Sequence, residues 1–164
     1  AINCLKDEKL VNMLIELGVY SKAEIASRYE VLLESYCKTI QVEALTALKM
    51  AKNEIFPACV SYLKEISQAS YSIRDSKGKN KFLIKEVKNI SDLVSKMKEK
   101  IEILDEMIVK ARSKKLTMLQ SAIIWRDNVL VAMKDLRKYV DSLETVVGEK
   151  YWPMPNYIDL LYGI

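Results

Sequence analysis

The chain has 164 residues, with 26 basic and 22 acidic side chains, three cysteines and no histidine. Without an imidazole it cannot form a Ser-His-Asp or Cys-His relay, a histidine-ligated zinc site, a Glu-x-x-His di-iron site or a histidine pH switch. It has only four glycines and three prolines. β-Sheets need these residues for their turns, and phosphate-binding loops need glycines so that the backbone can approach the phosphate closely. We therefore expect an all-α protein that folds as a single helical domain over residues 1–164.

Neither the apolar runs nor the cysteines indicate a membrane protein or a secreted protein. The longest apolar runs, at 122–125 and 129–133, are far shorter than the roughly 18 to 20 residues of a membrane span. The N-terminal residues lack the apolar core of a signal peptide. Cys4, Cys37 and Cys59 form no Cys-x-x-Cys pair, so we expect reduced, buried and unreactive thiols. The expected location is the cytoplasm.

The first two helices are predicted from their end signals. Apolar residues at helical spacing predict a short helix over residues 5–17, which a following glycine closes. The sequence Ser21-Lys-Ala-Glu24 is a capping box and starts a second helix. Because the apolar spacing resumes after Pro57, we predict one long helix over residues 22–71 with a kink at Pro57.

The apolar stripe of this long helix predicts which side faces the core. The members of the stripe recur at intervals of four and three residues, and one of them, Glu43, is charged. The other members of the stripe are Ile25, Tyr29, Leu32, Tyr36, Ile40, Ala47 and Met50. The residues beside them that widen the stripe are Leu33, Cys37, Ala44, Leu48 and Ala51.

Two further helices are predicted after a polar loop at residues 72–80. An unbroken heptad stripe predicts a third helix over residues 81–110 with coiled-coil-like packing. A fourth helix is predicted over residues 117–147, after a turn near 111–117; since no glycine or proline marks that turn, one very long helix is the alternative. The stripe of the third helix consists of Leu83, Val87, Ile90, Val94, Met97, Ile101, Leu104 and Ile108. The stripe of the fourth consists of Leu119, Ala122, Arg126, Val129, Met133, Leu136, Val140, Leu143 and Val147.

The last residues, 151–164, differ from the rest of the chain. They contain two prolines spaced by one residue and four aromatic side chains. The prolines predict an extended path, and the aromatic side chains predict packing against the bundle or a neighbouring domain. The expected fold class is therefore an antiparallel bundle of three to four long helices, with a short N-terminal helix and an extended proline- and aromatic-rich C-terminal arm.

Glu43 and Arg126 are the charges that interrupt apolar stripes. A buried charge without a partner would cost several kcal/mol. We therefore predict that both are members of structural ion pairs, with each other or with other partners, that fix the register of the bundle. The methionines on the stripes, Met50, Met97 and Met133, are expected to fill gaps in the core. The sequence predicts no catalytic, cofactor-binding or metal-ligating residue in this chain.

The positive charge is concentrated in residues 74–115, which hold 13 basic and 7 acidic side chains. The carboxylates are interleaved with the lysines, and aromatic side chains that could stack on bases are missing from the pattern, so a solvated helical face is favoured. Two alternative functions remain open on this evidence. One is a free-standing helical adaptor that binds partner helices, and the other is a module that binds nucleic acid or an acidic partner.

Three segments resemble type III glutamine synthetases. Residues 21–58 resemble the segment of that family that follows the catalytic domain. The terminal Trp152-Pro-Met-Pro-Asn-Tyr157 is similar to the family's closing Trp-Pro-x-Pro-Thr-Tyr, and the Trp125-Arg126-Asp127 triplet is similar to its aromatic-Arg-Asp. The chain departs from the family at Gln41-Val42, where Asn-Ile is expected, and at Asn156, where Thr is expected. The matching residues of the first segment are Ser27, Arg28, Tyr29, Glu30, Glu34, Tyr36, Lys38, Ile40, Glu43, Ala44, Thr46, Met50, Ala51, Ile55, Pro57 and Ala58.

The resemblance implies that this chain is the non-catalytic C-terminal domain cut from a larger enzyme. Enzymes of that family join glutamate and ammonia with ATP and Mg or Mn, through a γ-glutamyl phosphate, and assemble as stacked hexameric rings. Their metal, nucleotide and glutamate residues lie in a β-rich catalytic domain. No active-site residue or cofactor is therefore expected here, and the expected partners are the catalytic domain of the same chain and further copies of the enzyme.

Overall fold

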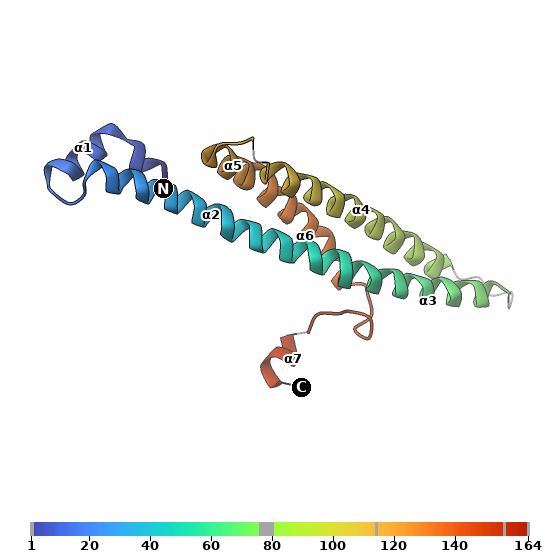
Figure 1. Cartoon of the computed structure of the whole chain (residues 1–164). Helices are drawn as coiled ribbons and strands as arrows, with labels where there is room; N and C mark the ends of the chain where they lie inside the picture. The colour runs from blue at the N-terminus through green and yellow to red at the C-terminus, as the bar shows by residue number, and fades with distance from the viewer. Residues whose placement is uncertain (1, 76–80, 114, 156, 164) are drawn as a thin grey trace.

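The structure, a computed structural model, describes residues 2–75, 81–113, 115–155 and 157–163. These residues form helices and no strand, which confirms the all-α fold class. Figure 1 shows an elongated bundle of long rods that run alongside one another, with a small helical hairpin at the N-terminal end and an arm at the C-terminal end. The helices in chain order are η1 (Ile2–Lys6), α1 (Glu8–Glu16), α2 (Lys22–Met50), η2 (Ala51–Ile55), α3 (Phe56–Asp75), α4 (Lys81–Ala111), α5 (Met118–Ile124), η3 (Trp125–Val129), α6 (Leu130–Glu144) and α7 (Tyr157–Tyr162).

The N-terminal hairpin is set by local capping. Asp7 Oδ1 accepts hydrogen bonds from the backbone N–H groups of Lys9 and Leu10, so α1 begins at Glu8, later than the predicted residue 5. Residues Ile2–Lys6 form a separate 3₁₀ turn. Gly18 has a φ of 65°, a conformation that suits glycine, and it turns the chain toward α2.

The capping box at the start of α2 is present. The Ser21 hydroxyl accepts from the Glu24 backbone N–H at 3.2 Å, and the Glu24 carboxylate accepts from the Ser21 backbone N–H at 2.7 Å. Because both donors lie in the first turn of a helix, they would otherwise lack intrahelical partners. The two residues therefore fix the start of α2 at Lys22.

The first rod consists of α2, η2 and α3, and it continues through Pro57 as a helix up to Asp75 (Figure 1). The distortion at the proline takes the form of a π-helical segment, η2, directly before it, in which the Phe56 N–H donates to the Ala51 carbonyl. A proline has no N–H to donate and its ring collides with the carbonyl four residues earlier, and a widened turn relieves that collision. The predicted loop at 72–80 lies partly outside the described residues, and its first residues belong to α3.

The second rod is α4, and it is separate from the third rod that follows it in the chain. The alternative of one very long helix from residue 81 to residue 147 is therefore wrong. The helix α4 ends at Ala111, and α5 begins with a second capping box, Thr117 with Gln120. The Ser121 hydroxyl also donates to the Ala111 carbonyl at 2.8 Å and ties the two ends together. The third rod consists of α5, a π-helical segment η3 and α6, and it ends at Glu144.

The core lies between the rods and follows the predicted heptad stripe on α4. The helix α4 packs against both α3 and α6, and α2 packs against α4 and α5. The stripe is buried from Ile90 to the C-terminal end of the helix, which confirms the coiled-coil-like spacing there, whereas Leu83 and Val87 are only partly buried. Its buried members are Ile90, Val94, Met97, Ile101, Leu104, Ile108 and the following Ala111.

The C-terminal arm packs on the bundle at its start and leaves it at its end. Tyr151, Trp152 and Met154 contact the core, and the rings of Tyr151 and Tyr62 lie 5.5 Å apart between centroids. The helix α7 then stands away from the rods in Figure 1. None of the helices in the described ranges has the length and apolarity needed to cross a membrane.

Candidate functional site

The buried face of the first rod lies one residue away from the predicted stripe in its middle part. Leu33 and Ala44 are buried, whereas Leu32 and Glu43 are exposed. From Cys37 onward the buried positions recur at intervals of three, four and four, which is an 11-residue period. This period corresponds to about 3.67 residues per turn, and its second repeat includes the wider turn of η2. The buried members of the rod are Ile25, Tyr29, Leu33, Cys37, Ile40, Ala44, Leu48, Ala51, Ile55 and Cys59.

Glu43 and Arg126 do not pair with each other, and only Arg126 is a member of an ion pair, which lies at the surface and does not join two helices. Glu43 is exposed and makes no ion pair among the described residues. Arg126 is also exposed and pairs with its chain neighbour Asp127, with Nε–Oδ1 at 2.6 Å and Nη2–Oδ2 at 2.8 Å. The buried position belongs to Trp125, the largest fully buried side chain, which the sequence reasoning missed. Neither charge therefore needs a partner inside the core.

The three cysteines are free thiols, but only two of them are buried. Cys37 lies beside Ser121, and burial raises the pKa of its thiol. Burial raises the pKa of the Cys59 thiol to about 11, so this thiol stays protonated and unreactive near neutral pH. The expectation of burial is wrong for Cys4, which is exposed in η1.

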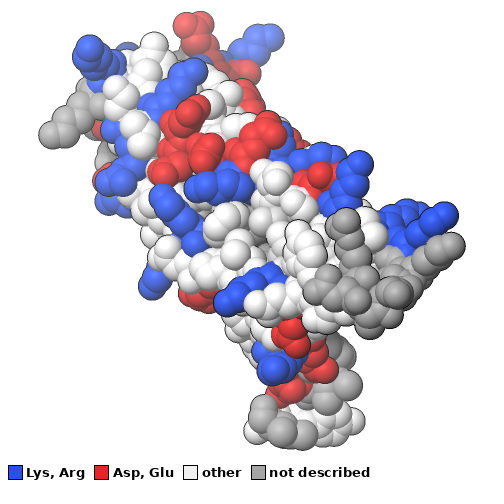
Figure 2. Space-filling model, turned by 90° about the vertical axis from the view of Figure 1, so that its right-hand side faces the viewer, with Lys and Arg blue, Asp and Glu red and all other residues white. Residues whose placement is uncertain are grey.

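The charged side chains of α4 are distributed as a solvated face. Lys98 pairs with Glu102 on the same helix at 3.3 Å, and Lys52 of η2 reaches Asp105 at 3.5 Å. On the face shown in Figure 2, blue and red side chains are interspersed, and the white areas between them are uncharged. Among the described residues no group of three metal-ligating side chains is found. In the part of α4 that the structure describes, the charges are therefore arranged as on a solvated helical face.

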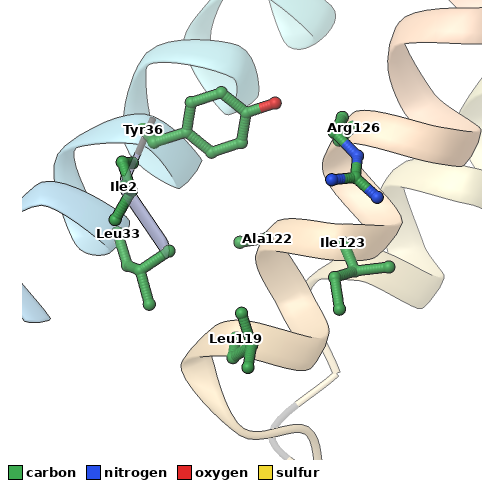
Figure 3. Close-up of a pocket in the computed structure, with 7 residues that line it drawn as sticks. All are labelled: Ile2, Leu33, Tyr36, Leu119, Ala122, Ile123 and Arg126. Carbon is green, nitrogen blue, oxygen red and sulfur yellow. The ribbon is translucent and has the colours of Figure 1, made fainter. Parts of the chain in front are cut away.

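A cleft of about 330 Å³ lies between α2 and the α5–η3 rod, and we call it the Tyr36–Arg126 cleft. Figure 3 shows Leu33 and Tyr36 on one wall, the side chains of α5 on the other, and the Tyr36 hydroxyl pointing toward Arg126. Burial raises the pKa of Tyr36, and the charge of Arg126 partly opposes that rise, so the two groups interact electrostatically. The complete lining is Ile2, Leu33, Tyr36, Leu119, Ala122, Ile123 and Arg126.

Arg126, which lines this cleft, is paired with Asp127, so its positive charge is balanced by an adjacent carboxylate. The hydrogen bonds from Arg126 hold the pKa of the Asp127 carboxyl below its usual range, and the same bonds raise the pKa of Arg126. Both groups are therefore ionised at neutral pH. Sequence spacing alone could not predict the cleft, because its walls come from helices far apart in the chain.

A second, larger groove of about 440 Å³ lies between the first and third rods and the C-terminal arm. Met50 and Met133, which were expected in the core, are only partly buried and line this groove together with Met154. Met97 is fully buried, as predicted. The indole nitrogen of Trp152, which also lines the groove, is buried without a hydrogen-bond partner among the described residues.

The fold and these surfaces define an elongated all-α domain with apolar clefts between its rods. Residues 1–74 match the family model described as "Glutamine synthetase C-terminal domain". The chain is also 30% identical to "Glutamine synthetase" of Butyrivibrio fibrisolvens over 98% of its own length and 23% of that protein. It is 27% identical to "Type-3 glutamine synthetase" of Dictyostelium discoideum, over 99% of this chain and 23% of the relative.

A third relative, "Glutamine synthetase" of Bacteroides fragilis (strain YCH46), is 30% identical over 92% of this chain and 21% of its own length. The chain thus spans less than a quarter of the curated relatives it matches. It matches the C-terminal domain of glutamine synthetases, including type III, which confirms the resemblance found in the sequence.

Proposed function

We propose that this chain is the non-catalytic C-terminal structural domain of a type III glutamine synthetase. The full-length enzyme would make glutamine from glutamate and ammonia with ATP, and Mg or Mn would be bound by residues outside this chain. The observation that carries the proposal is the match over almost the whole chain to the C-terminal part of glutamine synthetases. The free thiols agree with the proposed cytoplasmic location.

In this proposal the domain packs against the catalytic domain of the same chain, within a homo-oligomer of stacked hexameric rings. Exposed apolar side chains at both ends of the chain support such a contact. Leu17 and Val19 at the N-terminal hairpin, and Leu160 and Leu161 on α7, are each more than half exposed. Exposed apolar side chains that lie close together, as the neighbours Leu160 and Leu161 do, are typical of interaction sites.

The proposal is tested by comparing the full-length protein with the 164-residue chain. We expect the full-length protein to form glutamine from glutamate, ammonia and ATP, and the 164-residue chain to show neither this activity nor ATP binding in calorimetry. ATP binding by the 164-residue chain, or a gene that encodes no catalytic domain before it, would contradict the proposal.

The contact surface is tested in the full-length protein with aspartate substitutions. The double variant Leu160→Asp and Leu161→Asp should weaken the assembly and lower synthetase activity, because it places charges on the proposed contact. The matched control is Val109→Asp on α4, which is also exposed and lies outside the proposed contact. Equal behaviour of the two variants in light scattering and in the activity assay would contradict the proposed position of the contact.

A further inference from the structure

The Tyr36–Arg126 cleft combines an apolar interior with one polar end. Leu33 from α2 and Leu119, Ala122 and Ile123 from α5 provide the apolar walls (Figure 3). Its volume of about 330 Å³ lies within the range of small-molecule pockets, which are roughly 300 to 1,000 Å³. The apolar walls would therefore bind the hydrocarbon part of a ligand of modest size.

The polar end offers hydrogen-bond donors, one of them a guanidinium that is already paired with Asp127. Arg126 uses Nε and Nη2 on Asp127, so the described contacts leave its Nη1 group available. The Tyr36 hydroxyl points toward Arg126 from the opposite wall (Figure 3). A guanidinium and a phenol that face each other can both donate to the two oxygens of a carboxylate.

We propose that this cleft binds a small molecule with an apolar body and a single carboxylate, whose carboxylate lies between Arg126 and Tyr36. A neutral alcohol would lose the charge-assisted hydrogen bond from Arg126. An amine would place a positive charge against the guanidinium. This inference is independent of the proposed function, because it concerns a cleft that this chain forms by itself.

The probe is octanoate, compared with octanol and octylamine at equal concentration. We expect octanoate to bind the 164-residue chain with a dissociation constant on the order of millimolar, as the ligand efficiency of so small a molecule implies. In NMR titrations it should shift the methyl signals of Leu33, Ala122 and Ile123. Octanol should bind about tenfold more weakly, and octylamine more weakly still.

Two variants at the polar end should change binding in opposite directions. Arg126→Gln should weaken octanoate binding about tenfold and abolish its advantage over octanol. Asp127→Asn should strengthen octanoate binding by about threefold, because it removes the carboxylate that competes for Arg126. Both side chains are exposed, so circular dichroism should show unchanged helicity in both variants.

The matched control is Arg137→Gln. Arg137 also pairs with an aspartate, Asp141, but it lines the larger groove beside the C-terminal arm. This variant should leave octanoate binding unchanged. The proposal is overturned if octanoate and octanol bind equally, if Arg126→Gln has no effect, if Asp127→Asn weakens binding, or if Arg137→Gln is the variant that weakens it.

Discussion

Trp125 gives the sharpest test of which face of the third rod is buried. Its side chain is 1% exposed, whereas that of the adjacent Arg126 is 60% exposed. A buried tryptophan removes roughly 150–250 Å² from water, and at about 25 cal/mol per Å² this corresponds to ~4–6 kcal/mol. Substitutions of large aromatic core residues by alanine cost about 3–5 kcal/mol. We therefore expect Trp125→Ala to lower the free energy of unfolding by about 4 kcal/mol.

The assay is urea unfolding followed by far-ultraviolet circular dichroism, with tryptophan fluorescence as a second probe that reports on Trp152 alone in the Trp125 variants. The matched control is Arg126→Ala, which breaks only an exposed ion pair and should cost about 1 kcal/mol or less. Because domains are stable by only about 5–15 kcal/mol, Trp125→Ala could leave too little folded protein to measure. In that case Trp125→Phe should show a smaller loss that still exceeds that of Arg126→Ala. A larger loss for Arg126→Ala would refute the assignment of the buried face.

Three further predictions concern the N-terminal part of the chain and the thiols. Gly18→Ala should lower the melting temperature, with a cost of about 1 kcal/mol, because Gly18 has a positive φ; Gly18→Asn should cost less, and equal effects would contradict this reason. Ser21→Ala should cost about 1 kcal/mol in urea unfolding. Hydrogen bonds from Ser21 lower the pKa of Glu24, so the stability that this carboxylate contributes is present above its ordinary pKa and is lost as the pH falls through the lowered value. Ser21→Ala keeps the backbone N–H, which is the main cause of the lowered pKa, and removes only the hydroxyl. The Glu24 pKa, measured by NMR, should therefore rise only part of the way toward its ordinary value; a rise all the way to 4.5 would contradict the main role of the backbone hydrogen bond. Cys4 should react with iodoacetamide in the folded chain and Cys59 only after unfolding, as mass spectrometry of the labelled peptides can show; equal rates would refute the burial of Cys59.

The elements that could be predicted from the sequence are those fixed by local chemistry. The capping box of Ser21 and Glu24 depends on residues three positions apart, and the structure places its hydrogen bonds as expected. The heptad stripe of α4 could also be predicted, because that helix contacts other rods along its length and keeps one face toward them. Thr117 caps α5 in the same local way, although no glycine or proline marks the turn before it.

The buried face of the first rod depended on the period assumed for its stripe. On a helix a one-residue shift turns a side chain by about 100°, which is enough to move it from the core to water. Glu43 was assigned to the core by a spacing of three and four, while the observed 11-residue period buries Ala44 in its place. In the same way, Arg126 was assigned to a buried position that its neighbour Trp125 occupies. Both errors led to the same false requirement for a buried ion pair.

The candidate site could not be predicted for a different reason. The Tyr36–Arg126 cleft is formed by side chains of η1, α2, α5 and η3, and its chemistry depends on which of them face each other. Tyr36 and Arg126 were each assigned to an apolar stripe, where a polar group needs a partner. Their partial exposure in the structure removes that need and leaves both groups available to a ligand. The errors in register and the unpredicted cleft therefore have one origin: a charged or polar residue beside an apolar stripe marks the edge of a helix interface, and the edge is where a surface cleft can form.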